Sequence, residues 1–351
     1  MKKILPIHYP LIQHKPADAI LLSIIGDKKD EYSWIMNNFV NLRYNPKTKY
    51  DDFFRNDMWY NCYHITESRF TKEFIDLFST NPFDLIKRMI DAEYYIYIFL
   101  NRRFISNYNQ SDEDFWHNSL IYGYDEEQNI IYIADFFRGK RFDFETCSID
   151  EFCHAYSYPE GDEEFYFYVW NRAIKKKEGY QYRFNIDDLI LKLEDYIKCT
   201  DLNSSHYYTF DTNDVEEVEY MHIEGGYDYV YGIDVYDAIC EDLQNNELSI
   251  RPLHLLYEHK VLMCRRIAYL KEKGYLDTDT GLDDECMHLQ NEILIIRTLF
   301  LKYRMSNKLN EQNNLELCRR LKKLKTKEEK FVINLVRILR EYRMVSNDDK
   351  I

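Results

Sequence analysis

The pattern of apolar and polar positions is mixed in the first part of the chain and helical in the last part. From Tyr94 to Leu100, aromatic and aliphatic residues follow one another without a breaker, which predicts a buried central strand. Two further runs, Leu120 to Tyr124 and Ile130 to Ala134, flank the polar stretch Asp125 to Asn129 and predict a β-hairpin. The next element, Ser148 to Tyr156, reads as a short helix.

The region before the central strand predicts helices and irregular chain. Pro16 is a helix-start residue, and it is followed by an apolar run that Gly26 closes, which indicates a short buried helix. Another apolar run spans Trp34 to Leu42, whereas Tyr44 to Asp57 is polar and irregular. Residues Thr71 to Ile90 have helical spacing with a break near Asn81-Pro82.

A boundary signal lies at Pro159-Glu-Gly-Asp162. Beyond it, Phe165 to Trp170 and Gly179 to Asn185 resemble a hairpin, and Ile186 to Lys198 predicts a helix capped by Asn185. Residues Cys199 to Glu224 are polar and weakly patterned. Five more helices are predicted after Gly226, over Val235 to Gln244, Ile250 to Lys273, Asp283 to Arg304, Asn314 to Leu324 and Lys327 to Tyr342.

These patterns predict an α+β first domain over residues 1–158 and a second domain over 159–351, a small hairpin followed by a mostly helical layer. The 351 residues are 45% hydrophobic and 16% aromatic, so both domains have enough apolar material for a core. The formal charge of -15 argues against a nucleic-acid partner, because binding to phosphates needs clustered Lys and Arg.

Signals for secretion or membrane insertion are missing from the sequence. The basic N-terminus is interrupted by Pro6, His8 and Pro10 before an apolar region develops, and no apolar run is long enough to span a bilayer. The eight cysteines form no Cys-x-x-Cys pair, which favours free thiols in a reducing cytosol over disulfides. We therefore expect a cytoplasmic protein that does not bind a membrane and needs neither a metal nor a cofactor.

The predicted hairpin places two chemically useful residues close together. His117 begins the first strand and Asp135 ends the second, so the turn brings both to the same end of the hairpin. A carboxylate beside an imidazole fixes its tautomer and stabilises its cation, which makes His117 and Asp135 a candidate acid/base pair. The alternative is a pair of surface or hydrogen-bonded polar residues without a catalytic role.

The segment from Tyr94 to Tyr156 resembles the His-containing half of papain-like transferases and peptidases. The shared features are an apolar strand, a His that opens the next strand, a Gly-Tyr-Asp turn at Gly123, and an Asp that closes the third strand. It is similar to the bacteriocin-processing cysteine peptidases and, more closely, to the family of the butirosin-biosynthesis H acyltransferase. In the second half, Tyr231 to Asp237 and Arg251 to Lys260 resemble the helical C-terminal half of that family.

This resemblance implies a papain-like fold and a Cys nucleophile at the start of the first buried helix, where the helix dipole and the His partner favour the thiolate. The matching place, Lys15-Pro-Ala-Asp18, has neither Cys nor Ser. Cys62, two residues before His64, is the candidate for a relocated nucleophile, although a buried structural Cys is the commoner outcome. His14, just before the helix, is a candidate second base or substrate-positioning group that faces His117, or else an exposed loop residue.

A second group of ionisable residues lies on the helix predicted after Ile250. Arg251, His254 and Glu258 share one helix face, with His259 beside them. Such a set is a candidate substrate-binding site for an anion such as phosphopantetheine or a carboxylate. A metal is less favoured because the spacing supplies only two ligands per face. The alternative is a polar network that joins the helical layer to the first domain.

Two hypotheses follow from the sequence. The first is an acyl or peptidyl transferase of bacterial natural-product or antibiotic biosynthesis, in which a thiol attacks a carrier-bound or peptidic acyl group, His117 is the base and Asp135 orients it. An acyl- or peptidyl-carrier protein would be the partner. The second is a non-catalytic papain-like pseudoenzyme that serves as a binding or partner module, because the helix-start Cys is missing. A peptidase needs the same missing nucleophile.

Overall fold

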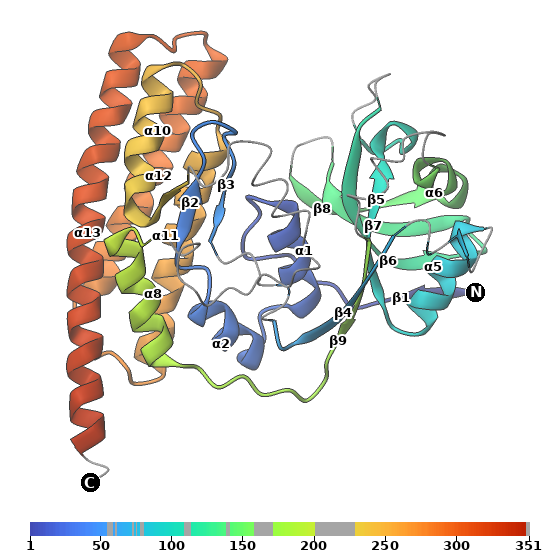
Figure 1. Cartoon of the computed structure of the whole chain (residues 1–351), viewed down its shortest axis with the longest axis horizontal. Coiled ribbons are helices and arrows are strands. Elements are labelled where there is room, and N and C mark those ends of the chain that lie inside the picture. The colour runs from blue at the N-terminus through green and yellow to red at the C-terminus, as the bar shows by residue number, and fades with distance from the viewer. Residues whose placement is uncertain are drawn as a thin grey trace. The chain divides into compact units, whose positions relative to one another are not determined.

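The chain divides into two compact units of mixed α and β structure, shown in Figure 1. This computed structural model describes residues 1–54, 59, 62–71, 74, 76–77, 81–108, 114–137, 141–157, 171–200 and 229–348. The first unit comprises residues 1–32 and 58–182, and the second comprises 33–57 and 183–351. This division differs from the predicted 1–158 and 159–351, because residues 33–57 belong to the second unit and the first unit continues to Tyr182.

The first unit contains an antiparallel sheet with seven strands among the described residues, in the order β4-β9-β5-β6-β7-β8, with β1 beside β6. The strands are β1 (Lys2–Ile4), β4 (Ile65–Phe70), β5 (Tyr95–Asn101), β6 (Trp116–Asp125), β7 (Ile130–Phe136), β8 (Phe142–Ser148) and β9 (Asn171–Lys176). Its helices are α1 (Pro16–Ile25), α5 (Pro82–Asp91) and α6 (Ile149–Tyr156), with the short 3-10 helix η1 (Arg102–Phe104).

Most local predictions for this unit are confirmed. The central strand β5 lies between β9 and β6, the hairpin forms from β6 and β7, and α1 ends at the predicted Gly26. The side chain of Ser148 accepts from the backbone N–H of Glu151 and so caps α6. The strand predicted at Gly179–Asn185 is wrong: these residues are irregular, and β9 lies earlier in the chain, at Asn171–Lys176. Its predicted partner, Phe165–Trp170, is outside the described residues.

The pairing register shows which side chains share a face of this sheet. His117 pairs with Leu100, whereas Tyr97 pairs with Leu120, so His117 and Tyr97 lie on opposite faces. Asp135 lies on the face that also carries Tyr124, because Tyr124 pairs with Ile131, four residues before Asp135. The ring of Tyr124 contacts Phe83 of α5, and α6 packs beside α5. Helices α5 and α6 therefore cover the face on which His117 and Asp135 lie.

The opposite face is covered by α1 and the segment that precedes it. The backbone of His8 donates to the carbonyl of Ser23, so this segment runs along α1. The hydroxyl of Tyr95 donates to the carbonyl of Pro6, and the ring of Tyr9 contacts Phe144. Both contacts are made on the face of the sheet that carries Tyr97, since Tyr95 is two residues from Tyr97 on the same strand.

The second unit is mostly helical, and its helices pack around α13. They are α8 (Ile186–Lys198), α10 (Val235–Gln244), α11 (Arg251–Glu272), α12 (Leu282–Met305) and α13 (Glu311–Asp348), with the 3-10 helix η2 (Gly232–Asp234). A small antiparallel sheet consists of β2 (Leu42–Tyr44), β3 (Asp51–Phe53) and β10 (Val230–Tyr231), in the order β10-β2-β3. Helix α2 (Lys29–Asn37) runs from the first unit into the second.

The predicted helices over 186–198 and 235–244 have the observed bounds, and those of α11 and α12 agree within one residue at each end. Two predictions here are wrong. The helices expected at Asn314–Leu324 and Lys327–Tyr342 are one continuous helix, α13. The stretch expected to be irregular, Tyr44–Asp57, contains β3, whose charged Asp51 and Asp52 hid the strand pattern. The stretch left unassigned between Cys199 and Glu224 is outside the described residues from 201 on.

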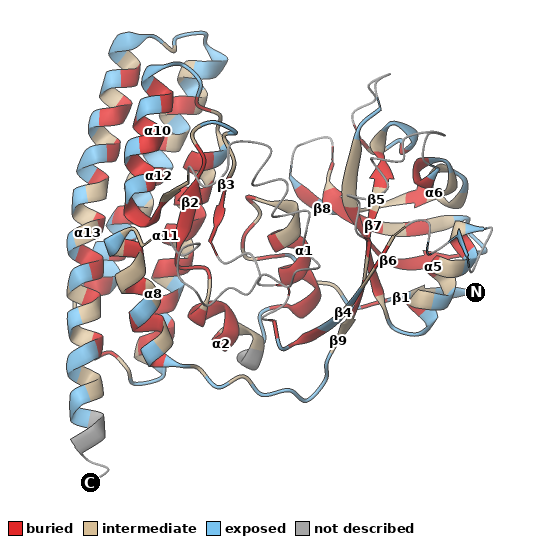
Figure 2. Cartoon of the chain, in the orientation of Figure 1, coloured by how far each residue is buried: buried red, intermediate tan, exposed pale blue. Residues whose placement is uncertain are grey.

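Burial follows the helical period in the second unit. Leu317, Leu321, Leu324, Leu335 and Leu339 of α13 are buried, and the buried positions recur along this helix in Figure 2. In the described part of the chain, no helix has both the length and the apolar composition needed to cross a bilayer.

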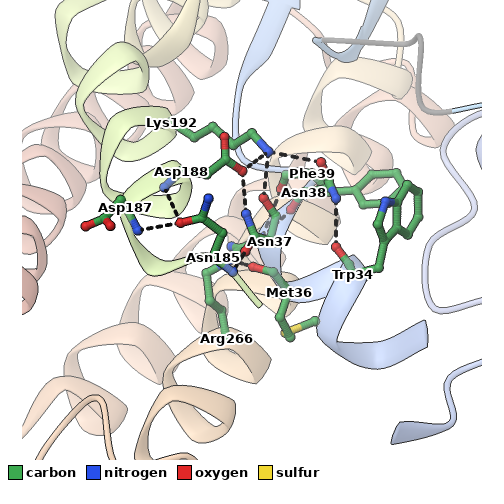
Figure 3. Close-up of polar contacts among 10 residues, drawn as sticks. All are labelled: Trp34, Met36, Asn37, Asn38, Phe39, Asn185, Asp187, Asp188, Lys192 and Arg266. Carbon is green, nitrogen blue, oxygen red and sulfur yellow. Dashed lines mark hydrogen bonds and ion pairs between the residues drawn. The ribbon is translucent and has the colours of Figure 1, made fainter. Parts of the chain in front are cut away.

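Polar side chains satisfy the C-terminal end of α2, as Figure 3 shows. Arg266 of α11 is fully buried, and its guanidinium donates to the carbonyls of Met36 (2.7 Å) and Asn38 (2.6 Å). Lys192 of α8 donates to the carbonyl of Asn37 (3.0 Å). Carbonyls at a helix end have no partner within the helix, and the helix dipole favours a cation there. These two cations therefore fix the end of α2 within the second unit.

Candidate functional site

The candidate site of the first unit is built around Asp135, at the end of β7. Its carboxylate is fully buried and accepts hydrogen bonds from Arg102 (2.7 and 2.6 Å), Tyr108 (2.5 Å) and Ser119 (2.6 Å). A buried carboxylate needs a counter-charge and hydrogen-bond donors, and these three side chains supply both. Burial and the charge of Asp135 raise the pKa of Tyr108 well above its usual value, so Tyr108 stays a protonated donor.

His117 lies at the start of β6 and is half-buried. Its Nδ1 is 2.8 Å from the guanidinium of Arg102 and 2.9 Å from the carbonyl oxygen of Asn118. A guanidinium can only donate, so a hydrogen bond from Arg102 needs Nδ1 as the acceptor, whereas a hydrogen bond to the Asn118 carbonyl needs a proton on Nδ1.

Arg102 is placed between the two predicted residues by the turn that ends β5. Asn101 caps η1 by accepting from the backbone N–H of Arg103, and Arg102 is the first residue of that turn. The guanidinium also lies over the rings of Tyr108 (4.7 Å) and Phe115 (5.4 Å). Sequence reasoning missed Arg102. One sequence signal could have indicated it. Arg102 and Arg103 directly follow the predicted strand β5, and the end of β5 pairs with the start of β6, where His117 lies.

The start of α1 lies on the other face of the sheet. Helix α1 begins at Pro16 with Lys15 as its N-cap, so its first turn carries no thiol or hydroxyl. His14 is buried, with its Nε2 3.4 Å from the carboxylate of Asp18. The chain segment that runs along α1 contacts Tyr95, which lies on the face of the sheet opposite His117. The structure therefore brings His14 to Asp18 and does not bring it to His117.

Cys62 is also remote from His117. It is buried and lies three residues before β4. Strand β4 begins at Ile65, which pairs with Lys176 of β9, and Lys176 extends past the first residue of the neighbouring strand β5. His117 instead pairs with Leu100, near the last residue of β5. The level of Ile65 is seven residues from that of Leu100, so at about 3.3 Å per residue Ile65 and His117 are roughly 23 Å apart along the strand direction. Burial raises the pKa of the Cys62 thiol to about 12, which disfavours the thiolate that a nucleophile needs.

Arg251 and His254 lie in the second unit, at the start of α11. Arg251 is half exposed and forms an ion pair with the buried Asp51 (3.3 Å). His254 Nε2 is 3.3 Å from the carboxylate of Glu258, and its ring stacks on Tyr257. The predicted i,i+4 contact is thus present, and each residue has a partner within its own unit.

A buried polar cluster follows on the same helix. Lys260 is paired with Glu328 of α13, and the Nδ1 of His259 accepts from the Lys260 ammonium (2.7 Å). Tyr196 (2.9 Å) and Tyr236 (2.6 Å) donate to the two oxygens of Glu328. The sequence placed His259 in a group that binds an anion or joins the helical layer to the first domain, and it gave no signal for Glu328 as its buried partner. Both are at most 1% exposed.

Among the residues that the structure describes, no group of three or more His, Cys, Asp and Glu side chains is arranged to hold a metal ion. Comparison with models of known protein families and with curated protein sequences found no match to this chain.

Proposed function

We propose that this chain is a relative of the butirosin-biosynthesis H acyltransferase family that has kept a papain-like scaffold without nucleophilic catalysis. In this proposal it is a cytoplasmic binding module of bacterial natural-product biosynthesis. The observation that carries the proposal is the position of Arg102, which donates to Asp135 and contacts Nδ1 of His117. The guanidinium takes the place where a catalytic His and Asp would contact each other.

Two further observations support the loss of catalysis. The first turn of α1 has Lys15, Pro16, Ala17 and Asp18 where the family has its nucleophile, and α1 packs on the face opposite His117. Covalent catalysis requires the nucleophile within hydrogen-bond reach of its base, a requirement that no residue of this helix start meets.

The surface beside Arg102 has the chemistry of a binding site for an acyl or peptidyl group. Phe115 is 53% exposed and stacks on the ring of His117 (5.9 Å between centroids). An exposed ring next to a half-buried imidazole offers an apolar contact for an acyl chain and a hydrogen-bonding group for its carbonyl. The partner we propose is an acyl- or peptidyl-carrier protein.

Catalysis is tested by intact mass spectrometry after incubation with an acetyl thioester of N-acetylcysteamine at near-neutral pH. We expect no acyl adduct on any of the eight cysteines. A stoichiometric adduct that is lost in a His117→Ala variant would overturn the proposal and restore the transferase.

Binding is tested with a carrier protein that bears an acylated phosphopantetheine, by calorimetric titration. We expect Phe115→Ala to weaken binding about tenfold, the loss expected for removing one buried aromatic contact. Ile4→Ala is the matched control, since Ile4 is exposed (42%) and pairs with Gly123, at the other end of β6 from His117. Equal affinities for both variants would contradict the proposed surface.

A further inference from the structure

Two cysteines face each other across the packed helices α11 and α12. The Sγ atoms of Cys264 in α11 and Cys286 in α12 are 2.7 Å apart. Both are free thiols in this structure. The two helices pack along each other in the second unit (Figure 1), so the sulfurs already lie within about an ångström of the length of a disulfide bond.

The two thiols differ in their access to solvent. Cys264 is half-buried and Cys286 is fully buried. The sequence neighbour of Cys264, Arg265, is exposed, so a small reagent can approach Cys264 from this side of α11. Only Cys264 is therefore open to a reagent from solvent, and Cys286 is positioned behind it.

The electrostatic surroundings also favour Cys264 as the reactive member. The hydrogen bond between the two thiols lowers the pKa of Cys264, and the Lys260 ammonium, one turn earlier on α11, acts in the same direction. The hydrogen bond and burial raise the pKa of Cys286, which keeps its proton. An accessible cysteine that is readily deprotonated, with a second thiol in contact, is the arrangement of a reactive and a resolving cysteine.

We propose that Cys264 and Cys286 form an oxidation site at which a low-molecular-weight disulfide closes a bond between α11 and α12. The Cys264 thiolate attacks one sulfur of the reagent, which forms a mixed disulfide and expels one thiolate. The Cys286 thiol then transfers its proton to a departing thiolate and attacks the Cys264 sulfur, which releases the second thiol. Two electrons pass from the cysteine pair to the reagent, which is reduced to two thiols. The closed bond ties α11 to α12 beside the buried Lys260.

The test uses the folded, fully reduced chain and oxidised glutathione as the reagent. After incubation, free thiols are blocked with N-ethylmaleimide, and the chain is digested with trypsin without reductant. We expect the peptide Val261–Arg265 to be linked to Gly274–Arg297, with reversal by dithiothreitol and a melting temperature several degrees higher for the oxidised chain. Recovery of Cys264 unmodified, or only as its glutathione adduct, would overturn the proposal.

Two variants separate this site from general thiol oxidation. In Cys286→Ala the linked peptide disappears and Cys264 accumulates as the glutathione adduct, because the resolving thiol is missing. In Cys199→Ala the link forms as in the unchanged chain, since Cys199 is a half-buried thiol of the same unit whose sulfur contacts the backbone carbonyls of Tyr196 and Ile197 at the end of α8. Loss of the link in Cys199→Ala would contradict the assignment to Cys264 and Cys286.

Discussion

Arg102 and Asp135 form an ion pair in which the carboxylate is fully buried and the arginine side chain is 13% exposed. Removing one member of such a pair leaves the other charge without compensation, which is more costly than losing an exposed pair. The remaining donors to Asp135 are the hydroxyls of Tyr108 and Ser119 and the backbone N–H of Phe136, which are all neutral and cannot replace the guanidinium. Arg102 is therefore a structural residue of the first unit in addition to its contact with His117.

We predict that Arg102→Ala lowers the free energy of unfolding by about 3 kcal/mol. Arg103→Ala is the control, because Arg103 is the next residue of the same turn and pairs with the half-exposed Asp114, so its loss should cost less than about 0.5 kcal/mol. Urea unfolding followed by circular dichroism measures both. A similar small loss for the two variants would show that Asp135 does not depend on Arg102.

At this scale the sequence predicts the location of the site and misses its chemistry. The hairpin brings His117 and Asp135 to one end and one face because both the turn and the two-residue period are local. Arg102 comes from another strand end, and its approach depends on the pairing of β5 with β6, which no local pattern specifies. Which face of the sheet α1 covers also depends on how the whole sheet assembles. The spacing of residues in the sequence therefore could not predict that Lys15 to Asp18 lie on the face opposite His117.

The packing of η2 against the end of α8 depends on a glycine. Gly232 has φ +57°, and a Cβ added there would lie 2.1 Å from the carbonyl oxygen of Tyr196. Gly274, at the end of α11, has φ +74° but open space around the same position. The two glycines thus share a left-handed conformation and differ in what surrounds them.

We predict that Gly274→Ala costs about 1 kcal/mol, the cost of the left-handed conformation alone. Gly232→Ala should cost about 3 kcal/mol or more, because the end of α8 must also move away from the new methyl group. Thermal unfolding of the two variants measures the difference. Equal melting temperatures would mean that α8 and η2 can separate at little cost.

Elements with strong local signals are predicted well. α8 has an Asn cap, two acidic residues in its first turn and a clear apolar period, and its predicted bounds are the observed ones. The error in α13 comes from the charged stretch around Lys325 to Lys327, which reads as a break. In the structure Lys325 pairs with Asp234 and Asp237, two contacts that are distant in sequence and let the helix continue.

At the scale of the whole molecule, each unit is assembled from segments that are far apart in the chain. Residues 33–57 join the second unit because β2 pairs with β10 and because Arg266 and Lys192 hold the end of α2. The turn-forming residues near 159 indicate a domain boundary. They contain no information on which N-terminal segment packs with the C-terminal helices. The predicted order of a mixed first part and a helical second part is correct, and the discontinuity is what the sequence could not show.

The second unit also has a buried core of ionisable groups, which makes its stability depend on pH. His259 donates from Nε2 to the carbonyl of Val40 (2.8 Å) and accepts at Nδ1 from Lys260, so it is neutral in the folded chain. Burial and the Lys260 charge lower its pKa from 6.5 to about 4. Burial opposes ionisation of Glu328, but Lys260 and His259 outweigh it and lower the pKa of Glu328 from 4.5 to about 2.

The sign of the pH dependence follows from proton uptake. Between about pH 6.5 and 4 the unfolded chain protonates His259 and the folded chain does not, so protonation favours unfolding and stability falls as the pH falls. Glu328 adds a second loss between about pH 4.5 and 2, because the unfolded carboxylate takes up a proton first. The contribution of His259 to the free energy of unfolding is on the order of 3 kcal/mol across its window.

We predict that His259→Gln lowers stability at pH 7, while its free energy of unfolding falls less steeply between pH 6.5 and 4 than that of the unchanged chain. Glutamine keeps a donor and an acceptor but does not titrate. His288→Gln is the control, because the side chain of His288 is 52% exposed, and it should follow the unchanged chain at every pH. Urea unfolding at half-unit intervals of pH gives the three curves. If the curve of unfolding free energy against pH for His259→Gln is parallel to that of the unchanged chain, the prediction is wrong, because the buried imidazole then takes up its proton without unfolding.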